Sequence, residues 1–355
     1  MSLPVIRTVV DAADFSKTVL PYVAQLNDLP QQILQSISNP QALKVLYVST
    51  NPLISAFAFS LFLFPIFLVG GEINKNYSQV DRFWSILPTL YNAHYVLYAH
   101  AVGLPTQRLD TLLAFSCVWT LRLTYNYWRK GGYNIGSEDY RWEVLREKIS
   151  PPLFFVFNVL FISLAQSVLL FSITTPTYIL LLASRLTASE YQTADLVFSR
   201  GLMGLVLLAF FADQQQWHYQ NAKKEYQKTA KVPPRFQQED LDRGFIVTGL
   251  WSWSRHPNFA AEQSVWVVLY QWSCWVTDVY FNWTIVGALS YLILFQASTW
   301  FTELISAKKY PEYAEYQKRV GKFLPRLGTD LPGDFRDKQG SKSNGKKAQS
   351  VKGTK

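Results

Sequence analysis

The stretch GLWSWSRHPNFAAE, residues 249–262, is the part of the sequence from which the fold is best interpreted. Aromatic, basic and acidic residues stand together in it, and an apolar run from Ser264 to Phe281 follows almost directly. Polar groups at the mouth of a membrane span are expensive to bury, so they usually mark a functional site. We therefore expect a binding site here, at the entrance of a membrane span.

The composition predicts an all-α integral membrane protein. Hydrophobic residues make up 49% of the chain and charged residues 17%, which is below the roughly 25% charged residues of soluble domains. The apolar residues gather in long runs, as in membrane spans. Aromatic residues reach 16%, which suits belts at the membrane surface. A soluble enzyme is therefore not expected.

Apolar runs of sufficient length predict about seven transmembrane helices. The expected spans are Leu53–Val69, Phe83–Leu104, Leu109–Trp128, Leu153–Ile173, Leu196–Ala212, Ser264–Phe281 and Trp283–Phe301. The run Tyr178–Ala183 is too short to cross a core of about 30 Å, and we expect it to be interfacial or re-entrant. The chain should thus divide into residues 1–50 with surface helices, a membrane domain over 51–327 and a disordered Lys-rich tail over 328–355.

The distribution of charge predicts the topology. The net charge is +9, and Lys and Arg concentrate in loops 129–148 and 223–255 and in the C-terminal tail. Cytosolic loops of membrane proteins carry this excess, so we expect a multi-pass protein with a cytosolic C-terminus. The bilayer accounts for the basicity, and no nucleic-acid partner is expected. The oligomeric state is not predicted.

Several chemistries are excluded by missing motifs. The four histidines (His94, His100, His218 and His256) lack the spacing of a di-iron membrane site, and the two cysteines cannot form a thiolate cluster. There is no phosphate-binding P-loop, nucleophile elbow or Rossmann fingerprint. No metal site is expected.

The stretch 249–262 has specific physical chemistry. Ser254 or His256 can cap a helix whose first residue is Pro257. Arg255 would then lie beside the positive end of that helix, a natural site for phosphate. The alternative is a basic anchor next to the membrane.

The next turn of this helix carries an amide and a carboxylate. Asn258 and Glu262 are four residues apart and share one helix face. Together they can bind a carboxamide or a ribose hydroxyl. The alternative is a polar contact between helices.

Other candidates are weaker individually. Arg122 lies within an expected span, where an arginine either faces a cavity or snorkels to the interface. Asp213 ends another span, either as a partner of Arg255 or Arg122 or as an interfacial cap. Tyr91 and His94 are candidate proton donors, although a satisfied core histidine is the commoner role. A further group either neutralises phosphates or marks the cytosolic side: Arg129, Lys130 and Arg141.

Three pieces of the sequence resemble the steroid 5-alpha-reductase superfamily, in its branch of uncharacterised fungal and bacterial membrane proteins. They are residues 119–123 continuing into 131–142, residues 250–262, and residues 310–317 ending at Phe323–Pro325. The resemblance covers roughly Val80–Leu327 and implies a seven-helix bundle of the endoplasmic reticulum membrane that opens to the cytosol. It also implies an enzyme that uses NADPH to reduce a carbon–carbon double bond of a lipid: a sterol, an enoyl thioester or a polyprenoid.

By position, the resemblance implies roles for individual residues. Asn258 and Glu262 would hold the nicotinamide end of NADPH, and Asp213 would contact the cofactor. Arg122 would lie near its phosphates. His256 belongs to the same matching stretch and is included with the cofactor-binding residues.

The sequence departs from the reductase pattern at the substrate end. Steroid reductases have a tyrosine where this chain has Trp119, whose indole N–H is not a useful acid. The Gln-Glu substrate pair of those enzymes has only Gln79 and Asp81 as candidates, so Asp81 joins Tyr91 and His94 as a candidate catalytic residue.

Two alternatives remain open. Arg255-His256-Pro257 also resembles isoprenylcysteine carboxyl methyltransferases, which implies S-adenosylmethionine as the cofactor. The third hypothesis is a non-catalytic lipid-binding protein that has kept the fold. Asn258 and Glu262, where the methyltransferases have a different pattern after the proline, favour NADPH.

Overall fold

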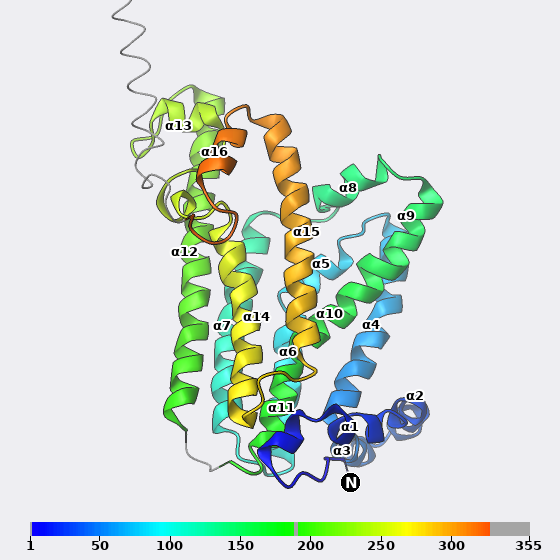
Figure 1. Ribbon diagram of the computed structural model, residues 1–355. Helices are drawn as coiled ribbons and strands as arrows, with labels where there is room; N and C mark the ends of the chain where they lie inside the picture. Colours follow the sequence, from blue (N-terminus) through cyan, green and yellow to red (C-terminus); the bar gives the residue numbers. More distant parts are fainter. Residues whose placement is uncertain (1, 188–190, 327–355) are drawn as a thin grey trace, which may run out of the picture. The chain divides into compact units, whose positions relative to one another are not determined.

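The computed structural model describes residues 2–187 and 191–326, and this part of the chain is all-helical (Figure 1). The one β-type contact among these residues is an isolated parallel bridge between Ser254 and Gly321. The expected disordered tail, residues 328–355, lies outside the described residues.

The chain forms two compact units. Within the described residues, unit 1 comprises 2–206 and 263–293, and unit 2 comprises 207–262 and 294–326. Three long helices contribute residues to both units: α12 (Thr193–Thr229), α14 (Pro257–Thr277) and α15 (Ile285–Lys309).

The N-terminal part of unit 1 is a set of short helices. These elements are η1 (Val9–Ala13), α1 (Phe15–Thr18), η2 (Leu20–Tyr22), α2 (Gln25–Ser36) and α3 (Pro40–Ser49). They precede α4 (Pro52–Asn74), the first long apolar helix. In Figure 1, α1, α2 and α3 gather at the end of unit 1 where α4 begins.

The start of α4 is fixed by its local sequence. The Asn51 side chain accepts a hydrogen bond from the Leu53 N–H at 2.9 Å, and Pro52 occupies the first helical position. Asn51 also donates from Nδ2 to the Tyr178 hydroxyl at 2.9 Å. The 23 residues of α4 give a length of about 35 Å. This is enough to cross a membrane core of about 30 Å.

The remaining helices of unit 1 follow in order. They are α5 (Gln79–Trp84), α6 (Leu87–Ala101), α7 (Gln107–Arg129), α8 (Tyr140–Arg146), α9 (Pro151–Phe157), the π-helical segment η3 (Asn158–Ala165), α10 (Gln166–Ser172) and α11 (Thr175–Ala183). Gly103, in the turn between α6 and α7, has a φ of 72°, which favours glycine. The two helices then pack together through hydroxyl contacts such as Thr89 with Ser116 at 2.7 Å.

The short apolar run Tyr178–Ala183, expected to be interfacial or re-entrant, is instead the last part of the candidate membrane span Pro151–Ala183. It forms α11, and every residue of that helix is buried. Its Tyr178 hydroxyl donates to the Thr18 carbonyl at 2.9 Å. The N-terminal helices and their neighbours in unit 1 therefore enclose α11, which places it in the protein core.

Four helices are long and apolar enough to cross a membrane, among the residues that the structure describes. They are Pro52–Asn74, Pro151–Ala183, Thr193–Thr229 and Ile285–Lys309. Three other expected spans are helical but do not belong to this set: α6 is only about 22 Å long, and α7 and α14 contain more polar residues. The protein is therefore an all-helical protein with four candidate membrane spans.

A buried ion pair ties the far ends of three helices together within unit 1. Arg108 Nε lies 2.7 Å from Asp195 Oδ1, and Nη2 lies 2.9 Å from Oδ2. The Trp272 indole N–H donates to the same carboxylate at 2.8 Å. Both charged side chains are almost completely buried, and a buried charge is tolerated only when it is paired and hydrogen-bonded.

Unit 2 packs around aromatic side chains. Its shorter helices are α13 (Gln238–Arg243), η4 (Gly249–Ser252) and α16 (Tyr313–Arg319). One cluster combines Phe245 with Tyr313 and Tyr316. Trp251 donates from its indole to the Ala212 carbonyl at 3.1 Å and accepts at its own carbonyl from the Tyr316 hydroxyl. These contacts hold the loop before α14 between α12 and α16.

Candidate functional site

The approach to α14 is a tightly fitted turn. Gly249 has a φ of 64°, and an added Cβ would lie 2.7 Å from the Gln215 side-chain oxygen. That oxygen accepts a hydrogen bond from the Leu250 N–H at 2.9 Å. Only glycine combines this backbone conformation with so close a neighbour. The start of the conspicuous stretch 249–262 is therefore dictated by packing.

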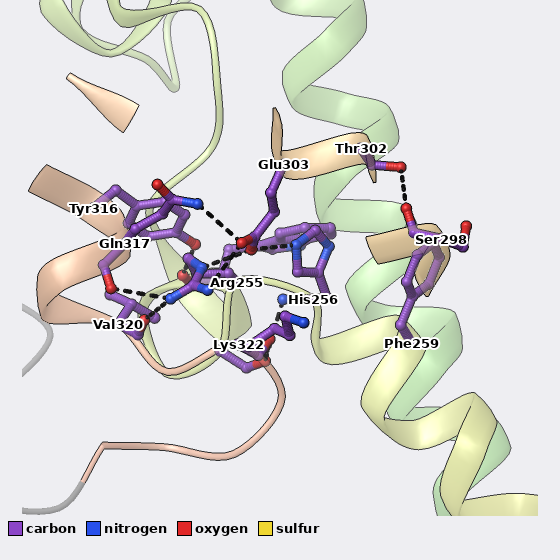
Figure 2. Close-up of polar contacts among 12 residues, drawn as sticks. Arg255, His256, Phe259, Ser298, Thr302, Glu303, Tyr316, Gln317, Val320 and Lys322 are labelled. Carbon is purple, nitrogen blue, oxygen red and sulfur yellow. Dashed lines mark hydrogen bonds and ion pairs between the residues drawn. The ribbon is translucent and has the colours of Figure 1, made fainter. Parts of the chain in front are cut away.

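A carboxylate on α15 anchors the basic residues before α14 (Figure 2). Glu303 accepts from Arg255 Nε at 2.7 Å and Nη2 at 3.0 Å, a bidentate pair, and lies 2.8 Å from His256 Nε2. Gln317 Nε2 donates to the same carboxylate at 2.9 Å. Arg255, His256, Glu303 and Gln317 are called the Glu303 cluster below.

The C-terminal segment closes onto this cluster. Arg255 Nη1 donates to the carbonyls of Gln317 and Val320, and the Arg255 and His256 N–H groups donate to the carbonyls of Gly321 and Lys322 at 2.9 and 3.1 Å. The Arg255 guanidinium is therefore held by protein groups at three of its nitrogens. The sequence suggested a phosphate ligand here; in the structure Arg255 has Glu303 as its counter-charge, and a phosphate role stays a prediction.

The His256 imidazole is buried beside the Glu303 carboxylate. Burial lowers the pKa of its imidazole, although the hydrogen bond to Glu303 acts in the opposite direction. Because a carboxylate only accepts hydrogen bonds, a neutral His256 must carry its proton on Nε2. Its ring also stacks on Phe259, with centroids 5.6 Å apart. The imidazole thus joins the cluster to the first turn of α14.

The helix begins where the sequence predicts. Pro257 is its first residue, and the Ser254 hydroxyl accepts from the His256 N–H at 3.2 Å. The same hydroxyl donates to the Lys322 carbonyl at 3.1 Å.

A second polar group lies one turn further along α14. Asn258 Nδ2 donates to Asp213 Oδ1 of α12 at 3.0 Å. Glu262 follows on the same face of α14, and both carboxylates are buried, with Glu262 5% exposed. The structure thus brings together Asp213 and Asn258, two of the residues to which the resemblance assigns cofactor contacts; their role toward a cofactor stays a prediction. The Asp213 and Glu262 carboxylates can accept hydrogen bonds and the Asn258 amide can donate them, which suits a ligand with amide and hydroxyl groups.

The other basic candidates belong to unit 1. Arg122 is buried on α7, and Arg129 at the end of that helix lies over the Tyr125 ring at 5.2 Å, next to the exposed Lys130. Arg141 forms a bidentate pair with Asp139, with both distances 2.8 Å. Burial alone would raise the pKa of Asp139, but Arg141 outweighs it and holds that pKa below the ordinary value.

The three candidate catalytic residues also lie in unit 1, in different surroundings. His94 has both ring nitrogens occupied, Nδ1 by the Tyr47 hydroxyl at 3.1 Å and Nε2 by the Pro52 carbonyl at 2.9 Å, which favours a structural role. Tyr91 is buried between Phe59 and Phe171.

Asp81, on α5, is the third candidate catalytic residue. It accepts from the Trp142 indole N–H at 2.9 Å. Burial raises the pKa of its carboxyl, despite the opposing charge of Arg141. A carboxyl group with a raised pKa can hold a proton for donation nearer neutral pH. No group of three His, Cys, Asp or Glu side chains among the described residues could hold a metal ion.

Sequence reasoning missed Glu303 and Asp195. Both are carboxylates within or beside long apolar helices, and an ionisable residue in such a helix usually has a partner. The presence of each carboxylate in or beside a long apolar stretch could have been noticed in the sequence. The partners, Arg255 and Arg108, could not be matched from sequence distance alone.

Comparison with known proteins identifies the family. Residues 66–320 match a family model described as "Protein of unknown function (DUF1295)". The chain is also 38% identical over 328 residues to an uncharacterized protein of Schizosaccharomyces pombe, which covers 92% of this chain and 94% of the relative. The chain therefore belongs to the DUF1295 family. No solved structure matches it.

Proposed function

We propose that this protein is a membrane-embedded, NADPH-dependent reductase that acts on a carbon–carbon double bond of a lipid. The proposal includes the seven-helix reductase bundle in the endoplasmic reticulum membrane, with α6, α7 and α14 as further spans. It rests on the resemblance of residues 250–262 to the steroid 5-alpha-reductase superfamily and on one structural observation, the Asp213–Asn258 hydrogen bond beside buried Glu262.

That observation has a physical reading. Buried carboxylates and an amide on apolar helices destabilise the fold unless they have partners. Asn258 Nδ2 donates to Asp213 Oδ1 at 3.0 Å. An amide nitrogen has two N–H donors and a carboxylate accepts several hydrogen bonds, so groups of these types can bind a ligand as well as each other. A nicotinamide carboxamide and a ribose hydroxyl have complementary groups. The residues of unit 2 therefore fit the nicotinamide end of the cofactor.

The expected roles follow from these contacts. Asn258 and Glu262 would hold the carboxamide and orient the ring, and Asp213 would fix Asn258 in that orientation. NADPH, when bound, supplies a hydride to the substrate. The reduction also needs a proton, and Asp81, whose carboxyl pKa is raised by burial, is the proposed donor. Arg122, Arg129, Lys130 and Arg141 remain predicted phosphate ligands.

The Glu303 cluster has a supporting role in the proposal. It fixes the first turn of α14 through Arg255 and His256, so the Asn258 and Glu262 side chains start from a rigid helix end. A binding constellation built on a fixed helix loses less entropy when it binds a ligand.

Ligand-induced stabilisation tests the proposal. The purified protein in detergent is heated with NADPH, NADH or S-adenosylmethionine, since a ligand that binds the native state raises the unfolding temperature. We expect stabilisation by NADPH that is lost in Glu262→Gln and kept in Glu225→Gln, a matched change on the exposed part of α12.

Each other outcome points elsewhere. Stabilisation by S-adenosylmethionine alone would overturn the reductase and favour the methyltransferase. Stabilisation by none of the three, in protein shown by extraction and absorbance to carry no bound nucleotide, would favour the non-catalytic lipid-binding protein.

A further inference from the structure

Helix α2 has an exposed apolar face. Leu29 points inward and is buried, whereas Pro30, Ile33, Leu34 and Ile37 are exposed; Leu34 is 71% and Ile37 63% exposed. Their spacing of three, four and seven residues places these four side chains on one side of the helix. A soluble surface rarely gathers large apolar side chains in such a row.

The opposite face is polar but almost uncharged. It consists of amides and one carboxylate: Gln25, Asp28, Gln31, Gln32 and Gln35. The helix contains no Lys or Arg. Amphipathic helices that depend on anionic lipids carry basic residues along their polar face. The surface that α2 fits is therefore apolar and need not be charged.

The position of α2 identifies that surface. The Gln25 side-chain oxygen accepts from the Asn51 N–H at 2.9 Å, and Asn51 caps α4. Because α4 is about as long as a membrane is thick, its capped end lies near one membrane boundary. Gln25 thus ties the first turn of α2 to that boundary. Helix α4 itself has exposed apolar side chains, such as Phe59 and Phe62, that suit contact with lipid.

We propose that α2 lies in the plane of the membrane interface, with Pro30, Ile33, Leu34 and Ile37 inserted into the boundary between headgroups and acyl chains. Its occupant is the lipid bilayer, and binding depends on apolar contact rather than on anionic headgroups. This inference is independent of the proposed enzymatic activity.

Two fluorescent probes on opposite faces test it. Ile37→Cys and Gln35→Cys are made in a Cys117→Ser/Cys274→Ser background, because these two cysteines are free. Each variant is labelled with an environment-sensitive dye in full-length protein and reconstituted in phosphatidylcholine nanodiscs. We expect a blue-shifted Ile37 probe that is quenched by spin-labelled lipid and shielded from iodide, and a Gln35 probe with the reverse behaviour. Added phosphatidylserine or high salt should change neither.

Three outcomes would overturn the inference. Equal iodide quenching of the two probes would show that α2 does not rest on lipid. Shielding of the Ile37 probe from both iodide and spin-labelled lipid would show that protein covers this face. A requirement for phosphatidylserine would contradict the charge-independent mode.

Discussion

His256 Nε2 and Glu303 Oε1 lie 2.8 Å apart and join the start of α14 to α15, with Arg255 on the same carboxylate. The Glu303 side chain is 7% exposed. Its carboxylate therefore binds Arg255 and His256 in a place where water can replace few of these hydrogen bonds. Removing one member of a buried pair leaves the others without compensation.

We expect Glu303→Gln to lower the free energy of unfolding by about 3–5 kcal/mol, because it leaves the Arg255 charge buried without its counter-charge. Thermal unfolding in detergent measures the effect. The matched control is Glu315→Gln, which weakens exposed pairs with Arg319 and Lys318 and should change stability by about 0.5 kcal/mol or less. Equal effects of the two substitutions would contradict the buried role of Glu303.

The pKa of His256 predicts a loss of stability in acid. Since this pKa is below the ordinary value of 6.5 in the folded protein, the unfolded chain binds a proton first as the pH falls. The contribution of a group with a depressed folded-state pKa is complete above its unfolded pKa and is lost as the pH falls below it. Stability should therefore decline below about pH 6.5, and this decline should be shallower in His256→Gln. His218→Gln, at an exposed position, is the control and should keep the wild-type slope.

Exchanging two side chains tests the Asp213–Asn258 contact. Asn258→Asp alone places a second carboxylate opposite that of Asp213, where the wild-type contact is 3.0 Å long. This should destabilise the protein by about 1–3 kcal/mol. The double variant Asp213→Asn/Asn258→Asp restores an amide–carboxylate bond in the opposite direction and should recover most of that loss. A double variant no more stable than the single one would argue against this hydrogen bond.

The same double variant separates stability from ligand binding. If the proposed cofactor site is correct, the exchanged pair recovers stability but still shows a reduced thermal shift with NADPH, because donor and acceptor have changed places. If stability and the thermal shift with NADPH both recovered fully, the Asp213–Asn258 pair would have a structural role only.

The buried pair Arg108–Asp195 should behave as a structural element. Arg108→Met leaves the Asp195 carboxylate with only the Trp272 and Gln192 N–H groups, and we expect a loss of about 3–5 kcal/mol. Adding Asp195→Leu should recover part of this loss by removing the isolated charge. If the double variant were less stable than Arg108→Met, the loss of the hydrogen bonds from Trp272 and Gln192 would outweigh the gain from removing the unpaired charge, and the expectation would be wrong.

Local signals in the sequence correctly predicted the start of α14. Pro257 is its first residue, because the fixed φ of proline acts within a few residues. The start of α4 at Pro52, one residue before the expected span, has the same kind of local signal in Asn51 and Pro52. The long apolar runs gave the all-helical character and four candidate membrane spans. These features depend on the residues beside them, so one sequence is enough to read them.

Features that depend on distant residues were not predictable in this way. Arg255 meets Glu303 from 48 positions away, and nothing in its neighbourhood distinguishes that partner from a phosphate. The apolar run that forms α11 has the same composition whether it lies at an interface or in the core; the N-terminal segment and its neighbours decide this. The Asp213–Asn258 contact was not predicted: Arg255 and Arg122 were the expected partners of Asp213, and in the structure the Asn258 amide donates to it.

The bridge between Ser254 and Gly321 has a consequence for the order of biosynthesis. The two residues are separated by the whole of α14, α15 and α16, so this end of α14 cannot close until the segment after α16 has been synthesised. Until then, the Arg255 and His256 N–H groups lack the Gly321 and Lys322 carbonyls to which they donate in the folded protein. The charged end of α14 is therefore completed only after the last helices of the chain have been made.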